Sequence, residues 1–130
     1  MTQEERQLLL IDLCARLPYG VKFASFSEDM IYHSEPVILR QIYWNEDYNA
    51  NGIEGDGDMS TIIEFVKPYL RPMSSMTEEE KIEYSVFFNY DGVEYPDEYI
   101  DWLNKKMFDY RGLIEKGLAL EAPEGMYKNE

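Results

Sequence analysis

The residue pattern with the most defined chemistry lies near the middle of the chain. Asp47, Asn49 and Asn51 place oxygen-bearing side chains at alternate positions. Counting Asp47 as position 1 puts Gly52 at position 6 and Asp58 at position 12. These are the positions at which an EF-hand loop carries its oxygen ligands and its sharp-turn glycine. The spacing therefore predicts calcium as a cofactor, bound by these three residues and Asp58.

The same stretch departs from the EF-hand pattern. Position 12 holds an aspartate, whose shorter side chain reaches a bidentate geometry less easily than glutamate. Glu54 occupies position 8, where an apolar residue normally pairs with a second loop, and the sequence contains no second loop. Asn, Asp and Gly are also the ordinary residues of turns. A solvated hairpin loop over residues 45–58 is the alternative hypothesis.

Catalytic signatures are few. His33 is the single histidine and Cys14 the single cysteine, so a Cys–His pair would require tertiary proximity. Cys14 falls with Leu10, Leu13 and Leu17 on the apolar side of an expected helix, which predicts a buried thiol. The 26 acidic residues offer many chance carboxylate pairs. An enzyme with a carboxylate site is thus an alternative that no specific motif supports.

The charge balance excludes several partners. The 130 residues contain 12 Lys plus Arg and 26 Asp plus Glu, a net charge of −14. This charge repels nucleic-acid phosphates and anionic lipid surfaces, so we expect neither direct nucleic-acid binding nor membrane binding. Residues 41–66 and 82–104 contain no Lys or Arg. Such acidic stretches favour a protein partner with a basic surface.

Tyrosine is the second compositional signal for an interaction. The chain has 11 tyrosines, and tyrosine is enriched at protein interfaces. Combined with the acidic stretch, this predicts partner-binding residues around the polar loop. The candidates are Tyr43, Tyr48, Glu54 and Asp56.

The first half of the chain is expected to form a helix followed by a sheet. Thr2 and Glu5 form a capping box that starts a helix ending near Leu17. The apolar side of this helix, which carries Leu13 and Cys14, does not include Asp12 or Arg16. Three strands are expected over Val21–Phe26, Met30–Ser34 and Val37–Trp44, with ambiguous structure over 61–66 and an extended segment over 67–72.

The second half is expected to be mainly helical. Thr77 and Glu80 form a second capping box, and its helix should end near Phe88. A turn follows over 89–92, and Pro96 opens a third helix. Asp109 is expected to cap a short fourth helix. An edge strand over 118–120 and a frayed tail over 123–130 complete the prediction.

These elements predict one α+β domain over residues 1–122. Its centre is a small antiparallel sheet over about residues 20–70, either open or closed into a barrel, between an N-terminal helix and two or three C-terminal helices. The acidic start lacks the basic region of a signal peptide, and no 18-residue apolar run occurs. We therefore expect a cytoplasmic protein. A second copy could pair with a sheet edge, so a homo-oligomer remains open.

Four segments resemble a known group of proteins. They are LCARLPYGVK at 13–22, VKPYLRPMSSMTEEE at 66–80, DWLN at 101–104 and FDYRGLIEKGLALEAPEGMYK at 108–128. They are similar to a widespread family of short uncharacterised proteins from gut anaerobic bacteria, their phages and mobile elements. The resemblance implies no activity or catalytic residue. Because residues 23–65 lie outside it, it implies a scaffold at the ends and partner recognition in the middle.

Together these observations favour a small acidic interaction protein of a phage or mobile element, without catalysis. A calcium-binding module using Asp47 to Asp58 and an enzyme with a carboxylate site are the alternatives. A nucleic-acid mimic is a narrower form of the first hypothesis, because it needs carboxylates spaced like phosphates on one face.

Overall fold

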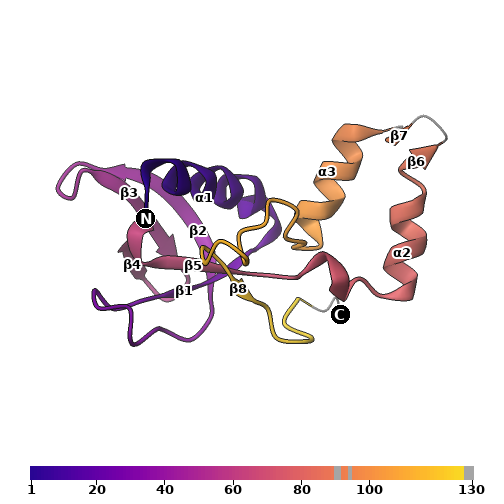
Figure 1. Ribbon diagram of the computed structural model, residues 1–130. Helices are drawn as coiled ribbons and strands as arrows, with labels where there is room; N and C mark the ends of the chain where they lie inside the picture. Colours follow the sequence, from indigo (N-terminus) through magenta and orange to yellow (C-terminus); the bar gives the residue numbers. More distant parts are fainter. Residues whose placement is uncertain (90–91, 94, 128–130) are drawn as a thin grey trace.

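The protein has an α+β fold in which one helix covers a six-stranded open sheet and a helical hairpin extends from it (Figure 1). The computed structural model describes residues 1–89, 92–93 and 95–127. The sheet order is β4-β3-β2-β1-β5-β8. Its strands are β1 (Lys22–Ser25), β2 (Val37–Asn45), β3 (Ala50–Gly55), β4 (Met59–Ile62), β5 (Val66–Leu70) and β8 (Leu120–Glu121).

The predicted α+β class is confirmed, but the sheet differs from the prediction in two ways. Four neighbouring pairs are antiparallel, whereas β5 and β8 pair in parallel, so the sheet is mixed. Among the described residues, β4 and β8 form two separate edges, and the sheet does not close into a barrel. Three short 3-10 helices lie at Leu17–Tyr19, Ile63–Phe65 and Met73–Ser75.

Helix α1 (Gln3–Arg16) begins at the predicted capping box and packs on the sheet. Leu9 and Leu13 are fully buried in the core, while Cys14 is exposed. The predicted buried thiol is therefore wrong. Asp12 and Arg16, which were expected off the apolar side, are both fully buried.

The buried pair on α1 is possible because its charges are matched inside the protein. Arg16 donates from Nε to the Asp12 carboxylate at 2.9 Å and from Nη2 to the Phe108 carbonyl oxygen at 2.6 Å. Arg111 donates to the other Asp12 oxygen at 2.6 Å. These partners offset the cost of removing charges from water, and they come from a segment about a hundred residues away in sequence.

Strand β3 was not predicted, because residues 45–58 looked like one polar loop. Ile53 faces the interior, Ala50 is buried on the opposite face of the strand, and the two strand glycines are covered by side chains of β2. A Cβ at Gly52 would lie 2.3 Å from the Tyr43 ring. A Cβ at Gly55 would lie 2.3 Å from a Val37 methyl. The glycines serve close packing here, so their turn-like composition misled the prediction.

The predicted strand over Met30–Ser34 is also not formed. Residues 27–30 turn, and only an isolated bridge joins Phe26 to His33. The Asp29 carboxylate accepts hydrogen bonds from the Ser27 hydroxyl and the Ile31 backbone N–H. These local bonds stabilise a turn in place of a ladder.

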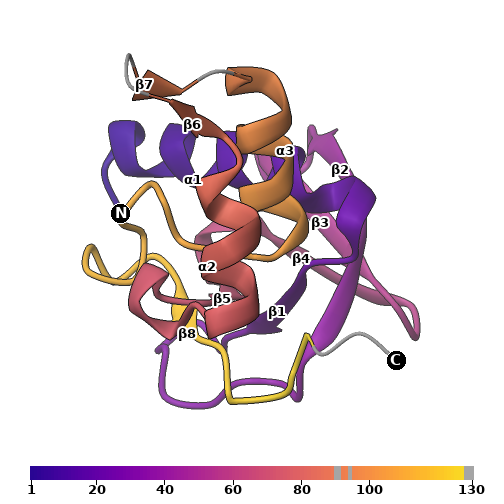
Figure 2. The ribbon, with the colours of Figure 1, turned by 90° about the vertical axis from the view of Figure 1, so that its right-hand side faces the viewer.

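Residues 77–106 form a helical hairpin that we call the arm. It consists of α2 (Glu78–Ser85), the short pair β6 (Phe88–Asn89) and β7 (Gly92–Val93), and α3 (Pro96–Lys105). In Figure 1 the arm extends from the side of the sheet, with α3 between α1 and α2. Figure 2, from the arm's side, shows α2 in front of α3. The second capping box is confirmed, α2 ends earlier than expected, and the predicted turn lies partly outside the described residues.

The C-terminal segment returns to the sheet. No fourth helix forms over residues 109–117. The Asp109 carboxylate accepts the Leu113 and Ile114 N–H groups, which lie further along the chain than the N–H groups that a helix cap accepts. Within the predicted tail, Tyr127 contacts the sheet. Its hydroxyl accepts the Lys22 N–H and donates to the Tyr69 carbonyl, both at 2.8 Å, and burial raises its pKa. Residues 128–130 of the predicted tail lie outside the described residues.

Candidate functional site

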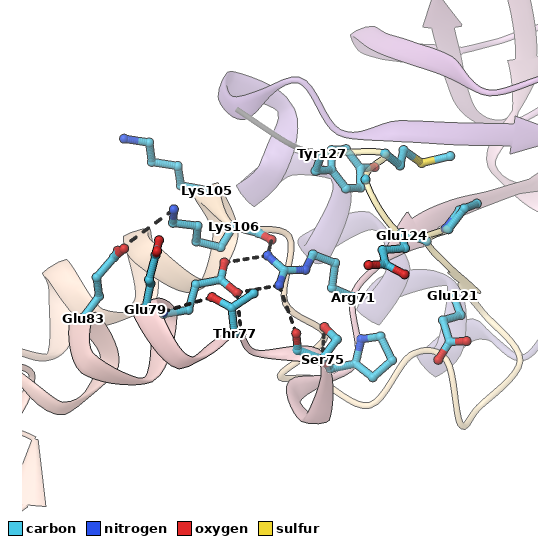
Figure 3. Close-up of a pocket in the computed structure, with 16 residues that line it drawn as sticks. Arg71, Ser75, Thr77, Glu79, Glu83, Lys105, Lys106, Glu121, Glu124 and Tyr127 are labelled. Atoms are coloured by element: carbon cyan, nitrogen blue, oxygen red, sulfur yellow. Dashed lines mark hydrogen bonds and ion pairs between the residues drawn. The ribbon is translucent and has the colours of Figure 1, made fainter. Parts of the chain in front are cut away.

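An open groove of about 740 Å³ lies where the arm joins the rest of the protein (Figure 3). One side is the start of α2 and the other is the segment after β8, with the end of α3 between them. Its polar lining residues are Arg71, Ser75, Thr77, Glu79, Glu80, Glu83, Lys105, Lys106, Glu121, Glu124 and Tyr127. Five glutamates against three basic residues make the lining acidic.

Arg71 fixes the base of the groove and is not free to bind a ligand. Its two terminal nitrogens donate to the two Glu80 oxygens at 2.7 and 2.6 Å, a bidentate pair. Nη1 also donates to the Lys106 carbonyl at 3.4 Å, and the guanidinium lies 4.3 Å from the centre of the Phe108 ring. Glu80 is held as a carboxylate, because the hydrogen bonds from Arg71 lower its pKa to about 2. Arg71 thereby ties α2, α3 and β5 together.

The exposed charge in the groove comes from glutamates on facing sides and from Lys105 at the end of α3. Glu79 projects from α2, and Glu121 and Glu124 come from the C-terminal segment (Figure 3). Glu83 is partly engaged, since it accepts the Trp102 indole N–H at 2.8 Å and lies 4.0 Å from the Lys106 ammonium. Carboxylates on two sides of an open groove attract a positively charged group between them.

The hydroxyl groups of the groove are engaged in local structure. Ser75 donates to the Pro72 carbonyl at 2.7 Å, and Thr77 accepts the Glu80 N–H as the helix cap. No histidine or cysteine occurs among the described residues that line the groove.

The arginines explain why the surface as a whole is acidic. All five lie within the described residues, and each pairs with a carboxylate of the same chain. The pairs are Arg6–Glu64, Arg16–Asp12, Arg40–Asp56, Arg71–Glu80 and Arg111–Asp12. Because Arg16 and Arg111 share Asp12, the five guanidinium groups pair with four carboxylates of the same chain. The acidic residues outside these pairs outnumber the lysines, so carboxylates are the main charge that the protein presents.

The structure does not bring the predicted calcium ligands together. Asp47 and Asn49 lie in the β2–β3 turn, and Asn51 lies in β3. Asp58 lies in the β3–β4 turn at the other end of β3. Six extended residues span about 20 Å, too far for one ion to bind at both ends. The loop that an EF-hand requires is not formed over residues 47–58, because β3 occupies its middle.

The predicted partner-binding residues are also separated. Tyr43 and Glu54 lie on the same face of the sheet, opposite the buried Ile53. Tyr48, 69% exposed, lies in the β2–β3 turn. Asp56 lies after β3, where its hydrogen bonds with Arg40 lower its pKa. Tyr43 and Glu54 share a surface, and the Tyr43 ring is partly used to cover Gly52.

The remaining chemical candidates lie on separate elements. Cys14 is exposed on α1, whereas His33 is exposed in the loop before β2 and packs its ring on Phe26. Within the part of the chain that the structure describes, no three His, Cys, Asp or Glu side chains are grouped so as to hold a metal ion.

None of the site residues predicted from the sequence line the groove. Its five glutamates come from positions 79, 80, 83, 121 and 124, and the sequence predicts only an extended segment over 67–72 before α2. The capping box did predict that Glu80 faces its own helix start. No local pattern shows that Arg71, nine residues earlier, reaches the same carboxylate.

Comparison with known proteins adds no family: no family model, curated protein or solved structure matches the chain. In the described ranges 1–89, 92–93 and 95–127, no helix has both the length and the apolar character needed to cross a membrane.

Proposed function

We propose that this chain is an acidic protein-interaction module, which binds a partner with a basic surface and carries out no catalysis of its own. Following the resemblance described above, its setting would be a phage or mobile element. The observation that carries the proposal is the groove, where exposed carboxylates face each other while Arg71 is neutralised by Glu80.

The proposed binding mode uses lysine or arginine side chains of the partner. A guanidinium or ammonium inserted into the groove would lie between Glu79 on one side and Glu121 and Glu124 on the other. Since these side chains are exposed, each contact adds little affinity by itself. Their joint field would accelerate association and make binding sensitive to salt.

The test compares charge reversal inside and outside the groove. We would immobilise the protein, capture partners from an extract of gut anaerobic bacteria, and purify the captured protein for direct binding measurements at low and high salt. Glu121→Lys with Glu124→Lys should weaken binding about tenfold or more at low salt and much less at high salt. The matched control is Glu46→Lys with Glu115→Lys, two exposed positions that do not line the groove.

Two outcomes would contradict the proposal. One is that the captured partner is acidic or binds equally well at high salt. The other is that the control pair weakens binding as much as the groove pair, which would mean that general negative charge, and not this groove, attracts the partner.

A further inference from the structure

The arm has an exposed helix face whose apolar residues its own packing does not use. The arm's interior is aromatic, and its members are Tyr84, Phe87, Phe88, Tyr99 and Trp102, with ring centres 4.8 to 6.1 Å apart. These rings connect α2 to α3. Ile82 and Val86 lie outside this cluster, 72% and 67% exposed.

Ile82 and Val86 belong to one continuous surface. Val86 directly follows α2 as its C-cap and keeps a helical backbone conformation. Since Ile82 is four residues earlier, the two side chains lie on the same side of a helix with 3.6 residues per turn. The same geometry puts Glu79 and Glu83 beside them, whereas Tyr84 points to the opposite side. Glu79 and Glu83 also line the groove. The outer face of α2 therefore continues from the acidic groove into an apolar pair.

We infer that this outer face of α2 is the docking surface through which the protein binds its partner, and that the partner supplies an apolar groove bordered by lysine or arginine. This inference rests on the proposed function and specifies the surface. Ile82 and Val86 enter the partner's groove as i and i+4 anchors, the usual mode for an amphipathic helix. Glu79 is exposed beside Ile82 and would pair with a basic residue at the border of that groove. Glu83, which already accepts the Trp102 indole N–H, adds negative charge next to Val86.

The charges argue against a second copy of this chain as the occupant. Packing two α2 outer faces together would bring four carboxylates, Glu79 and Glu83 of each chain, into one interface. Lys81 does not compensate, because it pairs with Glu78 at 3.1 Å. A basic partner removes this repulsion, which a self-complementary interface would retain.

The experiment replaces exposed apolar residues by serine at positions of similar exposure. The test variant is Ile82→Ser with Val86→Ser, and the control is Ile31→Ser in the loop before β2, where the isoleucine is 67% exposed. All are surface positions, and circular dichroism and thermal melting verify that each variant folds. Binding of the purified partner should weaken about tenfold or more for the α2 variant and by less than about twofold for the control.

A second measurement locates the contact directly. A photo-reactive amino acid placed at position 86 should crosslink to the purified partner, and the same group at position 31 should not. Sedimentation of the free protein should show a monomer whose mass is unchanged by Ile82→Ser with Val86→Ser.

The outcomes separate the two proposals. If the α2 variant binds normally while charge reversal at Glu121 and Glu124 abolishes salt-sensitive binding, the docking surface is wrong and the proposed function stands. If Ile31→Ser weakens binding and the α2 variant does not, the docking surface is likewise wrong. A dimer that the α2 variant dissociates would make the occupant a second copy. Failure to capture any basic partner would overturn both proposals.

Discussion

The body of the protein and its arm are stabilised by different kinds of packing. In the body, α1 and the sheet bury mainly aliphatic side chains, with members such as Leu13, Leu39 and Ile53 fully or almost fully buried. In the arm, aromatic rings on two short helices pack against one another, and most remain partly exposed. The body thus has a fully buried core whose residues come from distant segments of the chain. The arm has a small core that is built from neighbouring segments and is partly exposed to solvent.

The two regions meet at Phe108. Its ring is fully buried, with Trp102 of the arm 5.6 Å away and the Arg71 guanidinium over its face. Its carbonyl accepts the hydrogen bond from the buried Arg16. Because the arm relies on this joint and on few aliphatic contacts, it should open locally at a lower free energy than the body.

The largest effect is expected from breaking the charge cluster of the body. Asp12→Ala leaves Arg16 and Arg111 without their shared carboxylate and should lower the free energy of unfolding by about 3–5 kcal/mol. Urea denaturation measures it, with exposed Glu46→Ala as the control. A loss below about 1 kcal/mol would show that the cluster is not central to the body's stability.

A smaller effect, confined to the arm, is expected from Tyr84→Ala. This ring contacts Phe88, Tyr99 and Trp102, and it is only half-buried, so its removal should cost about 2–3 kcal/mol. Hydrogen exchange should accelerate for the amides of α2 and α3 and stay unchanged in the sheet. Equal loss of protection in both regions would mean that arm and body unfold as one unit.

The smallest effect is expected at the joint and depends on pH. The pKa of Glu80 is about 2 in the folded protein and near 4.5 when unperturbed, because Arg71 stabilises its charged form. Its contribution is therefore complete above about pH 4.5 and is lost as the pH falls toward 2. Glu80→Gln should remove about 1–2 kcal/mol of arm stability at neutral pH and flatten this acid dependence.

Trp102 fluorescence reports this change, since its indole lies in the arm. A Trp44→Phe background removes the signal of the other tryptophan, which is exposed on β2. If the Glu80→Gln protein retains the acid transition of the unmodified chain, another carboxylate is responsible for it.

Local sequence signals predicted the helix starts well. The capping boxes at Thr2 and Thr77 require only residues three positions apart, and both are formed with reciprocal hydrogen bonds. Pro96 opens α3 as expected. The β-branched and aromatic run in β2 was equally readable, because its strand preference depends on its own side chains.

The sequence predictions were wrong at positions whose structure depends on contacts with other segments of the chain. The sequence predicts a loop where β3 lies, because it does not show that Tyr43 and Val37 cover the two glycines of this strand. The α1 stripe was displaced by one position because Phe108 and Arg111 satisfy buried Asp12 and Arg16. The groove forms where Arg71, α2 and the returning C-terminal segment come together, and no local sequence pattern in any of the three predicts this contact.

The α+β class, the helix starts, the main strand and the acidic character of the protein could be predicted from the chain alone, since these depend on composition and on neighbours within a few positions. Which charges are buried, which glycines lie in a strand, and where exposed carboxylates gather became clear from the folded protein. The physical reason is that burial and ion pairing depend on partners brought together by folding, and here those partners lie up to about a hundred residues apart.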